Sequence, residues 1–206
     1  MDVQIFFIKP SGRVRRALRR FDGKGPCSQN GKYGYCNENL LYDYVHERSD
    51  EVVSRSMGRE YALAFSDKWP THCAHCRTPF TDDAAYQIFC EHEYVDAEDR
   101  QYFLRELPVG ACYEANWRRE HRAGYDGRSL YVQTPGGLWG IDERARNCTM
   151  PEDHEHRCWV RHGSPEDGTI HVDKNGNTCA AGAGSIQCGD YHGFLHNGKL
   201  TSCPEA

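Results

Sequence analysis

The feature that most constrains the folding of this chain is the crowding of cysteine and histidine into two stretches. Its 206 residues contain 11 cysteines and 11 histidines. Most of them lie between Cys27 and His92 or between Cys148 and Cys203. Such a density is typical of metal ligands, of a disulfide framework or of a thiol catalyst, and each of these implies a different function.

The beginning of the chain favours metal ligation over disulfides. Its apolar run, Ile5 to Ile8, is only four residues long, which is too short for a secretory signal, and the basic residues follow it instead of preceding it. No stretch approaches the length of a transmembrane helix, so no membrane partner is expected. We therefore expect a reducing cytoplasm, where lasting disulfides are rare. An odd number of cysteines would also leave one thiol unpaired in a full disulfide scheme.

The composition indicates a folded protein with a thin apolar core. Hydrophobic residues make up 38% of the chain and aromatic residues 12%, and the mean hydropathy is -0.79. The aromatic content excludes a disordered chain. Because the core is small for this length, bound metal is expected to supplement the burial of apolar surface.

Short strands joined by glycine-rich turns dominate the pattern of the chain. Residues 13–21 fit either a helix or a returning hairpin strand, and weak helical patterns occur at 60–65 and 113–121. We predict a β-rich α+β fold of small antiparallel sheets and hairpins, with loop-rich segments stabilised by zinc. Two lobes are expected, 1–105 with a zinc knuckle and 106–206 with the second Cys/His stretch, although one continuous domain is an alternative. The strands and hairpins are expected at 3–8, 85–94, 102–104, 129–141, 169–172 and 191–201.

The most specific short motif is Cys73-Ala74-His75-Cys76. Two thiols separated by two residues can bind one ion from a tight turn, a spacing typical of structural zinc. Two further ligands are needed, either Cys27 with Cys36 or Cys90 with His92. The first pair is favoured because it accounts for two cysteines in a polar loop. A redox role would require a strand-to-helix setting that the pattern lacks.

A second, less regular set of ligands follows in the other stretch. Cys148, His156, Cys158 and Cys179 could form a second structural zinc site. The alternative is that the cysteines are buried small hydrophobic residues beside Trp159, with histidines at the surface.

The same stretch also has a catalytic interpretation. Cys179 could be a nucleophile, with His192 or His162 as its base and the backbone amides of residues 180–185 as an oxyanion hole. An open zinc site could instead use His156, His162, His192 and Asp153 to activate water. Small residues after Cys179 equally suit a tight turn, so the sequence leaves open whether the protein is an enzyme and favours a binding role.

Five arginines lie between Arg13 and Arg20, although the net charge of the chain is -5. Contact with nucleic acid is one interpretation. A solvated face paired with acids such as Asp22 and Glu38 is favoured, because proteins that bind nucleic acid are usually basic overall.

Several stretches along most of the chain together carry a resemblance to a known family. They are FFIKPSGRVRRALRRF, WPTHCAHC, LPVGACYEANW, YDGRSLYVQTPGGLWGID, RNCTMPEDHEHRCWVRHG, HVDKNGNTCAAGAGSI and YHGFLHNGKL. These stretches resemble those of an uncharacterised family of Cys/His-rich proteins encoded by tailed bacteriophages. The resemblance implies a phage origin, expression in the bacterial host cytoplasm, and an accessory or virion-associated role through a phage or host protein partner. It implies no activity and no site residues.

Overall fold

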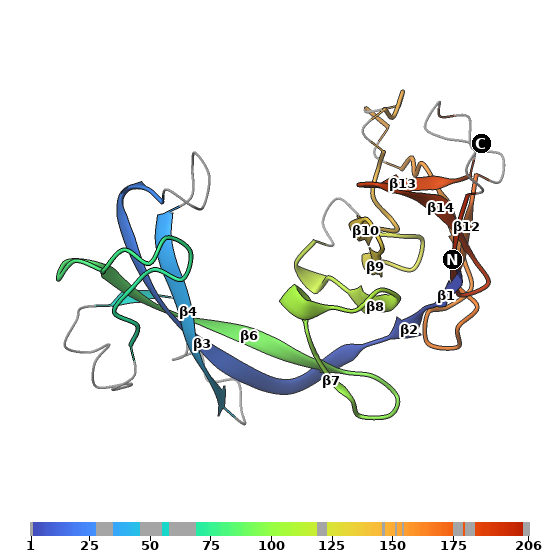
Figure 1. Ribbon diagram of the computed structural model, residues 1–206. Helices are drawn as coiled ribbons and strands as arrows, with labels where there is room; N and C mark the ends of the chain where they lie inside the picture. Colours follow the sequence, from blue (N-terminus) through green and yellow to red (C-terminus); the bar gives the residue numbers. More distant parts are fainter. Residues whose placement is uncertain are drawn as a thin grey trace. The chain divides into compact units, whose positions relative to one another are not determined.

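The chain forms two compact units in the computed structural model (Figure 1). The C-terminal unit comprises Met1–Lys9 and Val95–Ala206, and the N-terminal unit comprises Pro10–Tyr94. The predicted lobes differ from these units, because the division falls at residue 94 and the first nine residues belong to the C-terminal unit. The structure describes residues 2–27, 35–45, 55–57, 69–118, 123–145, 147–150, 152–153, 155–174, 179 and 184–203.

One antiparallel-rich sheet forms the N-terminal unit, with strand order β4-β3-β6-β5. The long strand β3 includes residues 13–21, so the hairpin-strand alternative is the correct one for this segment. It pairs antiparallel with β4, and its register shifts between Ala17 and Arg19 and again between Asp22 and Pro26. The strands are β3 (Lys9–Pro26), β4 (Tyr35–Val45), β5 (Arg55–Met57) and β6 (Ala85–Val95).

Arginines of β3 are held by acids of the neighbouring strand β6. Arg15 Nε donates to Glu91 Oε2 at 2.7 Å, with both residues buried, and Arg13 Nε donates to Glu93 Oε1 at 2.6 Å. A charge buried in this way requires a close partner of opposite sign. Arg13 and Arg15 therefore pair with acids, here Glu93 and Glu91. The expectation of a solvated face is wrong for Arg15, which is buried.

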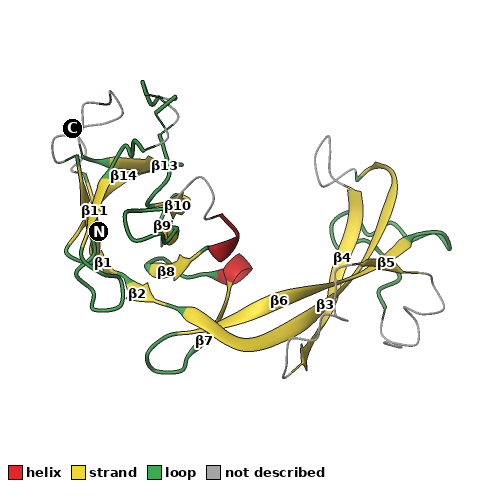
Figure 2. Ribbon diagram, turned by 180° about the vertical axis from the view of Figure 1, so that it is seen from behind, coloured by secondary structure: helices red, strands yellow, loops and turns green. Residues whose placement is uncertain are grey.

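Two four-stranded sheets and one two-stranded sheet form the described part of the C-terminal unit. The first has the order β1-β15-β14-β13 and the second β10-β9-β8-β2, with β2 parallel to β8. Figure 2 shows that strands account for most of the regular structure. The strands of these sheets are β1 (Asp2–Gln4), β2 (Phe6–Phe7), β8 (Ala111–Glu114), β9 (Leu130–Thr134), β10 (Gly137–Gly140), β11 (Val160–His162), β12 (His171–Asp173), β13 (Ile186–Cys188), β14 (Tyr191–His196) and β15 (Lys199–Ser202). The short strand β7 (Gln101–Phe103) lies outside these three sheets.

The first residues of the chain belong to both four-stranded sheets. β1 pairs with β15, and β2, two residues later, pairs with β8. Ile5 lies between them, with its amide bonded to the Gly198 carbonyl at 2.8 Å. Its side chain is buried in the main core, which also contains Cys112, Leu130, Val132, Trp139, Ile141, Cys158, Trp159, Ile170, Val172, Cys179, Ile186, Tyr191, Leu195 and Leu200.

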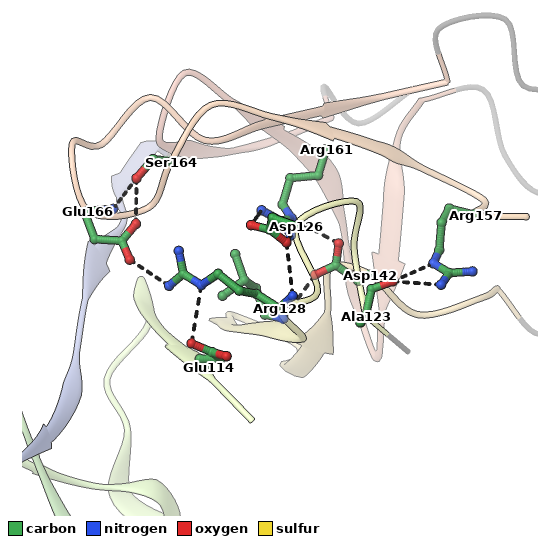
Figure 3. Close-up of polar contacts among 10 residues, drawn as sticks. Glu114, Ala123, Asp126, Arg128, Asp142, Arg157, Arg161, Ser164 and Glu166 are labelled. Atoms are coloured by element: carbon green, nitrogen blue, oxygen red, sulfur yellow. Dashed lines mark hydrogen bonds and ion pairs between the residues drawn. The ribbon is translucent and has the colours of Figure 1, made fainter. Parts of the chain in front are cut away.

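Charged side chains form a network around the buried Arg161 of β11 (Figure 3). Arg161 Nε donates to Asp142 Oδ1 at 3.0 Å, and Arg161 Nη2 donates to Asp126 Oδ1 at 2.6 Å. Asp142 also accepts the Leu130 backbone amide at 3.0 Å. Because Arg161 and Asp142 are 4% exposed, each depends on the other for neutralisation.

The helical part of the α+β prediction does not appear in the described residues. They contain two short 3-10 turns, η1 (Leu104–Glu106) and η2 (Asn116–Arg118). The helix expected at 113–121 is replaced by the end of β8 and by η2, while that expected at 60–65 lies outside the described residues. The fold is β-rich with small antiparallel sheets. No helix in this part of the chain is long and apolar enough to cross a membrane.

We predict that Arg161→Met lowers the free energy of unfolding by about 3–5 kcal/mol, because it leaves the Asp142 carboxylate buried without its cation. Urea denaturation of the two proteins would measure the difference. Arg105→Met, at an exposed position, is the control and should change stability by less than about 0.5 kcal/mol. Equal losses in both variants would contradict a special role for the buried pair.

The turn after β6 provides a pH-dependent contribution to stability. Burial of Asp96 acts to raise its pKa, but hydrogen bonds from the Tyr102 hydroxyl and from Arg100 outweigh this and lower the pKa to about 2. A lowered pKa means that the ionised form is stabilised in the fold. This contribution is fully present above the unfolded carboxyl pKa of about 4 and is lost as the pH falls through about 2.

Asp96→Asn is therefore expected to lower the melting temperature most above pH 4. The gap between the two proteins should close as the pH approaches 2, because the wild-type carboxyl becomes protonated there. Thermal unfolding followed by circular dichroism from pH 2 to 6 measures this. A gap that is constant across this range would show that the charge of Asp96 is not responsible.

Candidate metal centres

The N-terminal unit brings together four thiols from three places in the sequence. Cys27 follows β3, Cys36 lies in β4, and Cys73 and Cys76 lie in the loop before β6. Their sulfur atoms all lie within 4.8 Å of one another. The Cys27 and Cys73 sulfurs are 3.8 Å apart, and those of Cys36 and Cys76 are 3.5 Å apart. Four sulfurs bound to one tetrahedral zinc ion at about 2.3 Å would be about 3.8 Å apart.

The turn that presents Cys73 and Cys76 is built by its own backbone. The Cys73 amide bonds to the Thr78 carbonyl at 2.9 Å, and the Arg77 amide bonds to the Cys73 carbonyl at 3.1 Å. Arg77 has a φ of 62°, a left-handed conformation that reverses the chain directly after the second thiol. The spacing of two residues thus points both sulfurs in one direction.

The side chain of Arg20 in β3 hydrogen-bonds to the backbone on both sides of this turn. Its guanidinium donates to the Pro70 carbonyl at 2.9 Å and to the Thr81 carbonyl at 3.1 Å. The same group lies over the rings of Phe80 and Tyr86, at 5.1 and 5.0 Å from their centroids. An arginine that the sequence suggested for a charged surface therefore positions the Cys73–Cys76 turn against the sheet.

The thiols of this first cluster differ in how readily they ionise. The hydroxyl and backbone amide of Thr78 hydrogen-bond to Cys76 and lower its pKa to about 6. Burial, followed by hydrogen bonds with Cys76 and the other thiols, raises the pKa of Cys36. Ionising several thiols at such short separations requires a positive charge among them. The cluster therefore has the donors and the charge requirement of a cation site.

The C-terminal unit brings together Cys148, His156, Cys158 and Cys179 in the same way. The Cys158 sulfur lies 3.8 Å from the Cys179 sulfur and 3.7 Å from His156 Nε2. The Cys179 and Cys148 sulfurs are 3.6 Å apart. Three of the four residues are buried, with Cys158 and Cys179 in the main core. Residues 148 and 179, which are 31 apart in sequence, thus meet at one point.

Backbone amides face the sulfurs of this second cluster. The Ala145 amide donates to Cys158 at 3.3 Å, and the Met150 amide donates to Cys148 at 3.4 Å. Burial raises the pKa of Cys158 to about 12, and the Ala145 amide acts in the opposite direction. Such N–H donors stabilise a thiolate, as the outer shell of a metal site does.

Asp153 positions the backbone of His156, although it is not one of the four predicted ligands. The Asp153 side chain accepts the amides of Glu155 and His156, at 3.0 and 3.2 Å. Arg144 donates to the Met150 carbonyl at 3.2 Å and also to the Asp153 carbonyl. An Asp two or three residues before the ligand is the sequence signal that could have revealed this turn.

Both clusters could hold a metal ion, and the described cysteines form no disulfide. Sulfur atoms 3.5–3.8 Å apart are far from the S–S bond length of about 2.05 Å. Each cluster supplies four soft or borderline donors, the number that a closed tetrahedral site requires. Chemically, such a site stabilises a fold and leaves no coordination position for a substrate.

The alternative ligand and catalytic residues lie elsewhere. His92 is exposed on β6, and the side chain of Cys90 lies outside what the structure describes. His192 is exposed and bonds to the Ser185 hydroxyl at 3.1 Å, while His162 lies 3.5 Å from Asp173. Cys179, in contrast, is buried in the second cluster. Of the expected oxyanion segment, residues 180–183 lie outside the described part.

No family model matches this chain, and no curated protein or solved structure is significantly similar to it.

The contact between Thr78 and Cys76 predicts a change in thiol reactivity. In metal-free protein, Thr78→Val should raise the pKa of Cys76 from about 6 toward its ordinary value. Less thiolate would then be present at pH 7, since removing the hydroxyl donor disfavours the charged form. Iodoacetamide labelling across pH, read for Cys76 by peptide mass spectrometry, would measure the shift.

The matched control for this experiment is Thr71→Val. Thr71 lies in the same loop, but its hydroxyl bonds to His72 Nδ1 at 2.8 Å. In Thr71→Val, the pH at which Cys76 is half labelled should equal that of the wild type. An unchanged midpoint in Thr78→Val as well would show that Thr78 does not control this thiol.

Proposed function

We propose that this chain is a zinc-binding bacteriophage protein of accessory or virion-associated type, which acts by binding a phage or host protein. Zinc at Cys27, Cys36, Cys73 and Cys76 stabilises the N-terminal unit. A second zinc at Cys148, His156, Cys158 and Cys179 stabilises the C-terminal unit. The bacterial host cytoplasm is the site of expression and the virion a further location. The phage assignment rests on the sequence resemblance.

The observation that carries this proposal is the convergence of four donors in each unit. Thiolate and imidazole ligands in a tetrahedral set favour zinc over hard cations such as magnesium or calcium. With all four positions filled by protein, the metal has a structural role. A small apolar core gives such a role a clear benefit, since metal binding adds directly to folding free energy.

The contacts of the alternative residues favour a binding role over the other two functions. The Cys179 sulfur contacts the Cys158 sulfur in the second cluster. Its candidate bases have other polar partners, Ser185 for His192 and Asp173 for His162. Arg15 and Arg20 are buried and bonded within the N-terminal unit. Salt-sensitive binding to DNA or RNA that is lost on replacing Arg15 and Arg16 would instead support the nucleic-acid function.

Two zinc ions per chain are expected in protein purified without chelator. Cys73→Ser and Cys158→Ser should each reduce the content to one, because each removes one ligand from a different site. Inductively coupled plasma mass spectrometry gives the count. A chelator should lower the melting temperature of the wild type, since bound metal stabilises the fold.

Cys112→Ala is the matched control for these variants. Cys112 is a fully buried thiol of β8 in the same core as Cys158, but it belongs to neither cluster. This variant should retain two zinc ions even if its stability falls. Wild-type protein without bound metal, or a control that loses zinc equally, would overturn the proposal of two structural sites.

The biological part of the proposal needs a separate measurement. Mass spectrometry of purified virions, compared with the lysate of infected cells, would locate the protein. Virion peptides in stoichiometric amounts support the virion-associated form, and peptides confined to infected-cell lysate support the accessory form. A gene that lies outside any phage genome would contradict both.

A further inference from the structure

Three histidines and one aspartate that belong to neither sulfur-containing cluster gather at the small β11–β12 sheet. His162 of β11 lies directly opposite His171 of β12, and Asp173 follows two residues later. Alternate residues of a strand share one face, so these three side chains lie on the same side. The intervening pair, Arg161 and Val172, is buried on the other side.

The carboxylate of Asp173 lies between the two imidazoles. His162 Nε2 is 3.5 Å from Asp173 Oδ1, and His171 Nε2 is 3.4 Å from Asp173 Oδ2. Both distances exceed the length of about 2.7–2.9 Å that a charged hydrogen bond prefers. They are close to the separation of about 3.4 Å between two ligand atoms that each lie about 2.05 Å from a tetrahedral ion.

Two buried atoms of this group have no hydrogen-bond partner. They are His171 Nδ1 and Asp173 Oδ1. Buried polar atoms are nearly always paired, so an unpaired atom often indicates an ion or water that belongs at the site. Asp173 Oδ1 is also the atom that lies 3.5 Å from His162 Nε2, so an ion bound between these two atoms would give the oxygen a partner. His171 Nδ1 lies on the other side of its ring from Nε2, which faces Asp173.

A fourth donor lies alongside. The ring of His196, from β14, is stacked on that of His171, with centroids 4.4 Å apart. His196 therefore brings a third imidazole next to those of His162 and His171, whose ring centroids are 6.2 Å apart.

We propose that His162, His171 and Asp173 form a third, open binding site for a divalent transition-metal ion, with His196 as the adjacent further donor. Two imidazoles and one carboxylate favour ions such as zinc, cobalt, nickel or iron(II). The donors do not all lie within 4.8 Å of one another, unlike those of the two sulfur-containing clusters. The side chain of His162, which is 44% exposed, turns inward on binding.

This site differs chemically from the other two. Its ligands are nitrogen and oxygen, and the exposure of His162 and Asp173 leaves positions for water or an anionic ligand. Its ion therefore exchanges with solvent, whereas a buried four-ligand site retains its ion. The proposal does not rest on the assignment of zinc to the sulfur-containing clusters.

The test uses the full chain as purified, titrated with cobalt(II) chloride at pH 7.5. One cobalt per chain should bind with visible d–d absorption but without the near-ultraviolet sulfur-to-cobalt charge-transfer band. Asp173→Asn and His162→Gln should weaken this binding by more than about 100-fold, since even outer-shell changes cost about 10–100-fold. His192→Gln is the matched control, because His192 is an exposed histidine of β14 bonded to Ser185, and it should bind cobalt like the wild type.

The zinc content of each variant, measured in parallel, reports on the sulfur-containing clusters separately. If Asp173→Asn fails to fold, the cobalt affinity of His162→Gln decides the question, because the His162 side chain is exposed. Absence of cobalt uptake by the wild type would overturn the proposal. So would cobalt binding seen only with the charge-transfer band, or equal affinity in wild type and His162→Gln.

Discussion

The constraint on which both units depend is the close approach of four ionisable donors at a single point. In the N-terminal unit that point joins the ends of β3 and β4 to the Cys73–Cys76 turn, and in the C-terminal unit it joins the β10–β11 and β12–β13 connections to the main core. Like-charged thiolates at such distances repel unless a cation lies among them. In the C-terminal unit the cluster is continuous with the apolar core, since Cys158 and Cys179 belong to it and Ala145, Cys148 and Met150 pack against it.

The surroundings of each cluster are arranged to favour this assembly. Thr78 stabilises one thiolate, and the Ala145 and Met150 amides donate to two sulfurs. Arg20 is the clearest case of one side chain serving a distant site, because it bonds to carbonyls on both sides of the Cys73–Cys76 turn. A guanidinium can do this since its fork of donors reaches two acceptors at once.

How much the sequence predicts depends on whether the signal is local. The two-residue gap between Cys73 and Cys76 is a local signal, and the preference for Cys27 and Cys36 as their companions agrees with the cluster found. Strands at the start and end of the chain follow from their alternation. The pairing of Asp2–Gln4 with Lys199–Ser202 does not, because it joins the two ends of the chain. The helix-like spacing of Val14, Leu18 and Phe21 was misleading, since tertiary pairing with β4 and β6 overrides a weak local pattern.

The same reasoning explains why the sequence does not group His162 with His171 and Asp173. It instead suggests His162 either as a base for Cys179 or as part of a zinc site with His156, His192 and Asp153. His162 and His171 are separated by a turn whose length fixes which residues face each other, and that register is visible only once the strands are paired. On a helix, the spacing of two residues in the sequence determines whether their side chains are neighbours. On a hairpin, the register of the two strands determines this. In this chain the spacing of Cys73 and Cys76 is a local signal, whereas His162 and His171 are single residues brought together by the pairing of β11 with β12.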